Sequence, residues 1–158
     1  MYKMFEVLFY TFFWWKFSDF FTSYKANCAS AVYAVIYILM YSYYYSGNYY
    51  ILDDMYFWSM GYFIYDGLRL VNLNLAPKTP TNTGLVVHHL IAIMFLNDMY
   101  NGYFPEYISY VLFLGEVSNL PGFITYYFIK EKHQLRESSI LVQTFIYTTV
   151  RVLVMGYF

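Results

Sequence analysis

The feature that most constrains this chain is a stretch without a single charged residue, from Ala26 to Leu52. A helix needs about 20 mostly apolar residues to cross the hydrocarbon core of a bilayer, and this stretch is longer than that. The rest of the chain has a similar character, because only 12% of its residues are charged and 26% are aromatic. A soluble domain has about 25% charged residues, so the composition argues against a soluble globule. It also excludes a disordered chain, since disordered segments are rich in charge and poor in aromatic residues.

Apolar runs separated by polar breaks predict an all-α, polytopic bundle of about six membrane-spanning helices. The clearest breaks are Ser46-Gly47-Asn48, Asp53-Asp54 and the charged run from Lys130 to Glu137. The sequence leaves open whether the first apolar run crosses the bilayer or lies in its interface, since Lys16 and Asp19 interrupt it. The six predicted spans are Met4–Phe21, Asn27–Tyr45, Met55–Leu75, Gly84–Tyr100, Tyr107–Ile129 and Ser139–Phe158.

The loop charges predict an orientation. With six spans, one side of the membrane receives Lys16, Lys25, Lys78, Lys130, Lys132 and Arg136, and the other side receives Lys3. Positively charged loops stay in the cytoplasm, so we expect both termini on the non-cytoplasmic side. We therefore expect a multi-pass integral membrane protein of the endoplasmic reticulum or plasma membrane, or of a host membrane if the chain is viral.

Several partners and chemistries are not expected. A net charge of −1 argues against binding to nucleic acid, which requires a basic surface. The single cysteine, Cys28, excludes a disulfide framework or a cysteine-bound metal. The sequence has no HExxH motif, no glycine-rich phosphate loop and no G-x-S-x-G elbow. We predict no metal and no cofactor, and the sequence identifies no protein partner.

Polar groups inside the predicted spans are the candidate functional residues, because such groups are costly in hydrocarbon. They come from three predicted helices, yet all can face one cavity that opens toward the cytoplasm. The seven candidates for a lipid headgroup cavity are Asp66, Arg69, His88, His89, Glu116, Ser118 and Asn119. Asp66 and Arg69 are three residues apart, so they can instead simply neutralise each other on one helix face. For Arg151, a position at the membrane interface or interhelical hydrogen bonding is the simpler interpretation.

Three segments in this order resemble the TLC-domain family. They are Gly61-Tyr62-Phe63-Ile64-Tyr65-Asp66, Val87-His88-His89-Leu90 and Leu114-Gly115-Glu116-Val117-Ser118-Asn119. The stretch Asn27-Cys28-Ala29-Ser30-Ala31 resembles the start of the domain, so residues 27–158 are assigned to a TLC domain and residues 1–26 to a first hydrophobic segment. The family includes ceramide synthases, the TRAM translocon-associated proteins and several lipid-homeostasis proteins. The resemblance implies a helical bundle around a lipid-accessible cavity.

In ceramide synthases, the matching residues support acyl transfer from acyl-CoA to a sphingoid amine. The resemblance implies that His88 or His89 would be the base or acyl acceptor, with Glu116 as the acidic partner and acyl-CoA as co-substrate. This chain departs from the synthases, which have His-Asp where it has Gly115-Glu116 and a second Asp where it has Asn119. Its Glu-x-Ser form resembles the small TLC proteins linked to membrane phospholipid composition.

Three functions follow as hypotheses. The first is a protein that binds or senses membrane lipids and influences membrane lipid composition. The second is an acyl-CoA-dependent lipid N-acyltransferase that uses His88 or His89. The third is a proton- or ion-coupled transporter in which Asp66, His88 and Glu116 form a relay. The missing His-Asp pair favours the first over the second, and the absence of inverted halves weakens the third.

Overall fold

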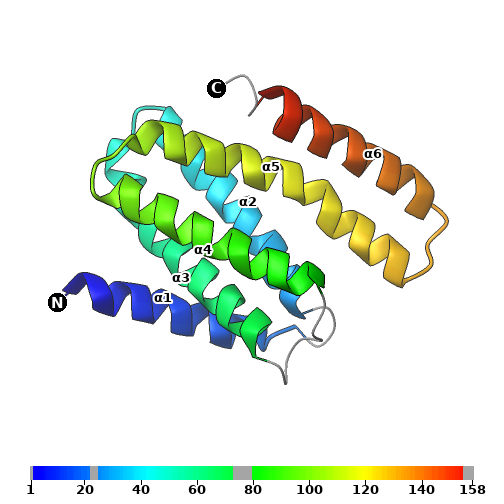
Figure 1. Ribbon diagram of the computed structural model, residues 1–158, viewed down its shortest axis with the longest axis horizontal. Helices are drawn as coiled ribbons and strands as arrows, with labels where there is room; N and C mark the ends of the chain where they lie inside the picture. The colour runs from blue at the N-terminus through cyan, green and yellow to red at the C-terminus, as the bar shows by residue number, and fades with distance from the viewer. Residues whose placement is uncertain (1, 22–24, 73–79, 155–158) are drawn as a thin grey trace.

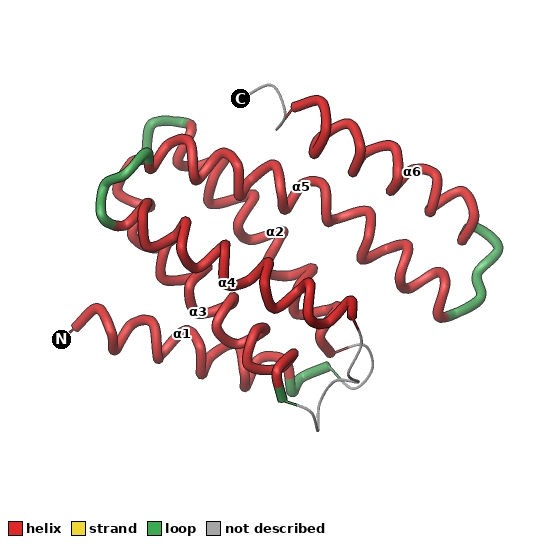
Figure 2. The backbone as a smooth tube through the Cα atoms, viewed as in Figure 1, coloured by secondary structure: helices red, strands yellow, loops and turns green. Residues whose placement is uncertain are grey.

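The computed structural model describes residues 2–21, 25–72 and 80–154, which form a bundle of helices that run alternately in opposite directions (Figure 1). No residue in these ranges belongs to a β-strand (Figure 2), so the prediction of an all-α fold is confirmed for the described part of the chain. The helices are α1 (Tyr2–Ser18), α2 (Lys25–Tyr45), α3 (Leu52–Val71), α4 (Pro80–Tyr100), α5 (Pro105–Lys130) and α6 (Arg136–Thr148), with a 3₁₀ turn η1 (Tyr49–Ile51) and a terminal π-helical segment η2 (Thr149–Val154).

The helix ends follow the local chemistry of the sequence. Asp53 and Asp54 lie in the first turn of α3 and Arg69 in its last turn, where each charge opposes the helix dipole. Pro105 begins α5, because a helix needs no amide donor in its first turn. Gly47 has a φ of 102° in the turn after α2, a conformation that glycine adopts without strain. Because of these residues, α3 begins at Leu52 and α5 at Pro105, a few residues before the predicted spans begin at Met55 and Tyr107.

Neighbouring helices are antiparallel except for α1 and α3, which run in the same direction. α1 and α4 both pack on α3, while α2 and α6 both pack on α5. At Gly61, α1 and α3 meet backbone to backbone, since an added Cβ atom would lie 2.5 Å from the Cβ atom of Tyr10 and 2.8 Å from its carbonyl carbon. Aromatic rings fill the space between α1, α2 and α3, with the rings of Tyr33 and Tyr62 stacked at 3.9 Å and Trp14 fully buried.

The distribution of polar and apolar residues differs from that of a water-soluble bundle at the outer faces and at a few buried positions. The outer faces carry large apolar side chains, such as Phe5 on α1 (71% exposed) and Met94 on α4 (66% exposed). The interior holds an apolar core and, in addition, ionisable groups, with Asp66, His89 and Glu116 each 5–7% exposed. A soluble helix presents polar residues outward and apolar residues inward. The exterior of this bundle thus matches an apolar surrounding better than water.

One helix is long and apolar enough to cross a membrane in the part of the chain that the structure describes. It is Asn27–Tyr45 within α2, close to the N-terminus, while Gly84–Tyr100 within α4 is a shorter apolar helix. The other predicted spans form helices without meeting this criterion, so the six-span arrangement stays a prediction. Lys78, residues 73–75 and residues 155–158 lie outside the described residues.

Candidate functional site

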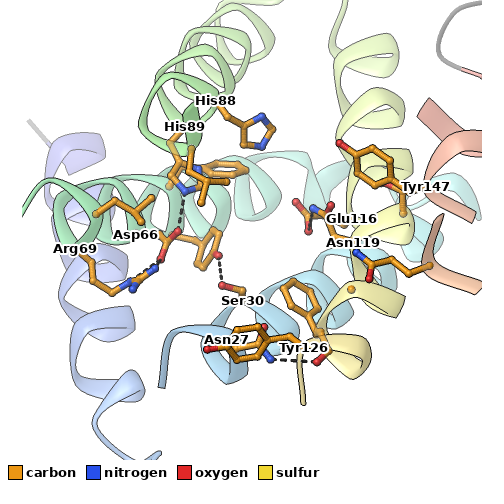
Figure 3. Close-up of a pocket in the computed structure, with 18 of the residues that line it drawn as sticks. Asn27, Ser30, Asp66, Arg69, His88, His89, Glu116, Asn119, Tyr126 and Tyr147 are labelled. Atoms are coloured by element: carbon orange, nitrogen blue, oxygen red, sulfur yellow. Dashed lines mark hydrogen bonds and ion pairs between the residues drawn. The ribbon is translucent and has the colours of Figure 1, made fainter. Parts of the chain in front are cut away.

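A cavity of about 750 Å³ opens between α2, α3, α4, α5 and the C-terminal segment formed by α6 and η2 (Figure 3). It lies beside the central turns of α4 and α5 and toward the end of α3. All seven of the polar residues selected from the sequence line it: Asp66, Arg69, His88, His89, Glu116, Ser118 and Asn119. Groups that are up to 53 residues apart in sequence (119 − 66) are thus gathered around one space.

On the wall formed by α3 and α4, charged and ionisable side chains are paired with one another through Asp66. The Asp66 carboxylate accepts hydrogen bonds from Arg69 Nε at 2.8 Å, through Oδ1, and lies 2.7 Å from His89 Nε2, through Oδ2. Arg69 Nη2 is also 2.8 Å from Oδ1, so the pair predicted from the spacing is formed. Both oxygens of this buried carboxylate are therefore satisfied, and its charge is balanced within the protein.

The two adjacent histidines have different surroundings. His89 is 6% exposed and bonded to Asp66, whereas the His88 side chain is exposed on the cavity side (Figure 3). Neighbouring residues on a helix point about 100° apart, which explains why one ring is held inside and the other is not. Because the Asp66 carboxylate can only accept, His89 Nε2 carries the proton between them. His89 Nδ1 is buried and has no hydrogen-bond partner among the described residues.

The carboxylate in contact with the histidine pair is Asp66, which lies 2.7 Å from His89 Nε2, and the role that the resemblance implies for Glu116 stays a prediction. α3 and α4 are antiparallel neighbours, so the end of α3 comes beside the middle of α4. Glu116 lies on α5, and its hydrogen bond in the described structure is with Asn119 rather than with His88 or His89.

On the wall formed by α5 and η2, the charged side chains form fewer contacts with groups of opposite charge. Glu116 is 7% exposed, and its Oε2 accepts one long contact of 3.5 Å from the Asn119 amide. No basic side chain of the described residues lies within ion-pair distance of Glu116. Arg151 comes close to this wall but donates to neutral groups, from Nε to Ser118 Oγ at 3.1 Å and from Nη2 to Asn119 Oδ1 at 3.4 Å. A buried carboxylate and a guanidinium therefore face the cavity without neutralising each other directly.

Several lining residues were not selected from the sequence as site residues. Arg151 was noted for interhelical hydrogen bonding, which the structure confirms, and its guanidinium also lies 5.1 Å from the Tyr147 ring. On α2, Ser30 accepts a hydrogen bond of 2.7 Å from the Tyr62 hydroxyl. Asn27 and Ser30 are three residues apart and so share a helix face, a spacing that could have marked them as lining residues. The lining residues absent from the selection, with Arg151, are Asn27, Ser30, Tyr62, Phe63, Leu70, Leu85, Gly122, Phe123, Tyr126, Gln143 and Tyr147.

The lining combines hydrogen-bond donors, acceptors and charges with aromatic rings, which suits the polar part of an amphipathic molecule. Within the described residues, no group of three or more His, Cys, Asp or Glu side chains is placed to hold a metal ion. Comparisons with protein-family models, curated proteins and solved structures gave no match to this chain. The resemblance to the TLC-domain family thus depends on the sequence motifs.

Proposed function

We propose that this chain is a multi-pass membrane protein of the TLC type that binds lipid headgroups in the polar cavity and thereby influences membrane lipid composition. The observation that carries the proposal is the contrast between an apolar exterior and one polar cavity that all seven selected residues line together. A protein that needed only to be stable in a membrane would not require these costly groups in one place.

The size of the cavity supports a small polar ligand. Its volume of about 750 Å³ lies within the range of roughly 300–1,000 Å³ that is usual for ligand pockets. Phe63, Phe123 and Tyr126 add apolar and aromatic surface beside the charged groups. A headgroup can contact the charged walls while the first carbons of its chains contact the rings.

The helix lengths support the membrane placement. α2, α3 and α4 have 21, 20 and 21 residues, or about 30 Å each at ~1.5 Å per residue. This length equals the thickness of the hydrocarbon core. The alternating direction of the six helices agrees with six crossings, with both termini on the non-cytoplasmic side by the loop charges.

Lipid extraction tests the proposal. The full chain is purified in an uncharged detergent, and the lipids that accompany it are identified by mass spectrometry. We expect a specific lipid class to be retained and to fall several-fold in His88→Ala/His89→Ala. The matched control is Asn97→Ala/Asp98→Ala, which changes two adjacent exposed polar residues of α4 outside this cavity.

Glu116→Gln provides a second variant that preserves side-chain shape, in case the histidine variant does not fold. The same unspecific lipids in the native chain and in every folded variant would contradict a headgroup site.

Lipid N-acylation is a second candidate, favoured by the contact of 2.7 Å between Asp66 and His89. A carboxylate that holds the proton of one imidazole nitrogen leaves the other nitrogen as a base. Radiolabelled acyl-CoA with a panel of lipid amines tests this activity. Turnover that required both Asp66 and His89 would establish an acyltransferase in place of a binding protein.

A further inference from the structure

One buried carboxylate of the polar cavity has no cationic partner among the described residues. Glu116 is 7% exposed and lines the cavity from α5, across from His88 on α4 (Figure 3). Its Oε2 atom has the contact of 3.5 Å with Asn119, and its Oε1 atom accepts no hydrogen bond from a described residue. A carboxylate buried in this way is stabilised by a ligand that brings both a positive charge and hydrogen-bond donors.

A positive charge lies beside this carboxylate but does not contact it directly. The Asn119 amide stands between the two groups, because its nitrogen donates to Glu116 Oε2 at 3.5 Å and its oxygen accepts from Arg151 Nη2 at 3.4 Å. The carboxylate and the guanidinium are thus separated by about the width of one amide group. Arg151 Nη1 donates to no described residue, so its N–H groups remain for an anionic oxygen of a ligand.

The charges of the cavity lining cancel as a whole. Asp66 and Arg69 form an ion pair at 2.8 Å, and Glu116 and Arg151 supply one further charge of each sign. With neutral histidines, the formal charge of the described lining is zero (−2 + 2). Such a lining attracts neither a simple anion nor a simple cation by its net charge. It favours a ligand that itself carries both charges close together.

We infer that the polar cavity recognises a lipid headgroup in which two carbons join a primary ammonium to a phosphodiester, with the ammonium against Glu116 and the phosphate against Arg151. This inference rests on the proposed function and names the class of lipid. A primary ammonium offers three N–H donors to the carboxylate, whereas a quaternary ammonium offers none. The ring of Tyr147, an aromatic face that a quaternary ammonium could use, already lies 5.1 Å from the Arg151 guanidinium.

Competition between headgroups on the native chain tests this inference. The full chain in an uncharged detergent is mixed with equal amounts of five lipids that share the same acyl chains, and native mass spectrometry counts the bound lipid. The headgroups are phosphoethanolamine, its N-methyl and N,N-dimethyl forms, phosphocholine and phosphoglycerol. Because methylation removes N–H donors and keeps the charge, we expect binding to fall along the series, with phosphocholine bound about tenfold less than phosphoethanolamine. Phosphoglycerol, which has no ammonium group, should bind as weakly.

Two variants assign the charges to their residues. Glu116→Gln keeps the shape of the side chain and should reduce the preference for phosphoethanolamine over phosphoglycerol from about tenfold to within about twofold. Arg151→Gln should weaken the binding of all five phospholipids several-fold. The matched control is Glu106→Gln, on an exposed part of α5 outside the polar cavity, which should keep the native preference. The methylation series needs no variant, so it tests the inference even where a variant does not fold.

The outcomes separate this inference from the proposed function. If phosphocholine or phosphoglycerol bound as tightly as phosphoethanolamine, and did so only with His88 and His89 present, headgroup binding would stand and the primary ammonium would be wrong. A preference that Glu116→Gln left unchanged would also overturn the inference. If no lipid bound above the level of His88→Ala/His89→Ala, the proposed function itself would fail.

A chain-free competitor distinguishes a lipid from a soluble ligand of the same chemistry. Glycerophosphoethanolamine carries the same two charges without acyl chains. We expect it to displace the bound lipid only at a concentration at least tenfold higher than that of the lipid, because the apolar chains add to binding. Equal displacement would contradict a lipid ligand, while the contacts assigned to Glu116 and Arg151 would stand.

Discussion

The two walls of the polar cavity differ in the partners that they give to a buried carboxylate. On the wall of α3 and α4, Asp66 is bonded to Arg69 at 2.8 Å and lies 2.7 Å from His89. On the wall of α5 and η2, Glu116 has one amide contact of 3.5 Å, and Arg151 donates its hydrogen bonds to neutral side chains. Both carboxylates are more than nine-tenths buried, so the difference is one of partners and not of exposure.

The comparison separates a structural role from a binding role. A charge that the protein itself neutralises stabilises the packing of two helices, and little of that charge is available for an ion pair with a ligand. A buried charge without a cationic partner costs free energy in the empty protein, and a ligand that carries the opposite charge removes that cost. Under the proposed function, we therefore expect Asp66, Arg69 and His89 to contribute mainly to stability, and His88 and the wall of α5 and η2 to contribute mainly to ligand binding.

The largest effect is expected for Asp66→Ala. Removal of this carboxylate leaves Arg69 and His89 without their shared partner, and we expect the free energy of unfolding to fall by about 3 to 5 kcal/mol. Unfolding in mixed detergent micelles, followed by circular dichroism, measures the change. The control is Asp54→Ala on the same helix, which is exposed and should change stability by less than about 0.5 kcal/mol. A similar loss in both variants would remove the distinction between the walls.

A smaller effect is expected from the two histidines, taken separately. His89→Ala loses the contact with Asp66 and should reduce the free energy of unfolding by about 1 to 2 kcal/mol. His88→Ala removes an exposed ring that lacks such a bond and should cost less than about 0.5 kcal/mol. The same unfolding measurement compares them. Equal losses would show that the buried contact of His89 adds no stability.

The smallest change in stability is expected for Glu116→Gln. The amide keeps the size of the side chain and an acceptor for Asn119, and it removes a buried charge, so unfolding should be unchanged or slightly less favourable. Lipid retention, measured by mass spectrometry, should nevertheless fall several-fold. The same acid-to-amide change at Asp66 provides the comparison, because it should lower stability. If Glu116→Gln lowered the free energy of unfolding by more than about 1 kcal/mol, the wall of α5 and η2 would have a stabilising role like that of the wall of α3 and α4.

The helices could be predicted from the sequence because apolar runs and polar breaks are local signals. The run Asn27–Tyr45 and the helix α2 even end at the same residue. The bounds differ where polar residues continue a helix, as Asp53 and Asp54 do in the first turn of α3. A search for apolar runs stops at such residues, although their negative charges stabilise the start of a helix.

The choice of partners inside the cavity could not be predicted in the same way. Position along the helices predicted that Asp66, His89 and Glu116 can face one cavity, but it does not say which helices are neighbours. The contact between α3 and α4 determines that His89 meets Asp66 and not Glu116. Arg151 illustrates the same limit, because its partners Ser118 and Asn119 are more than 30 residues away and only tertiary packing brings them together.

Gly61 has a consequence for how this sequence can vary. At the crossing of α1 and α3, a methyl group on Gly61 would come within 3.0 Å of atoms in the backbone of Tyr10 and Thr11, which cannot rotate away. Every other amino acid carries at least that carbon, so none of the nineteen replacements fits without separating the two helices. In a library that samples all substitutions along α3, position 61 should accept glycine alone, whereas positions on the exposed face of the same helix should tolerate many.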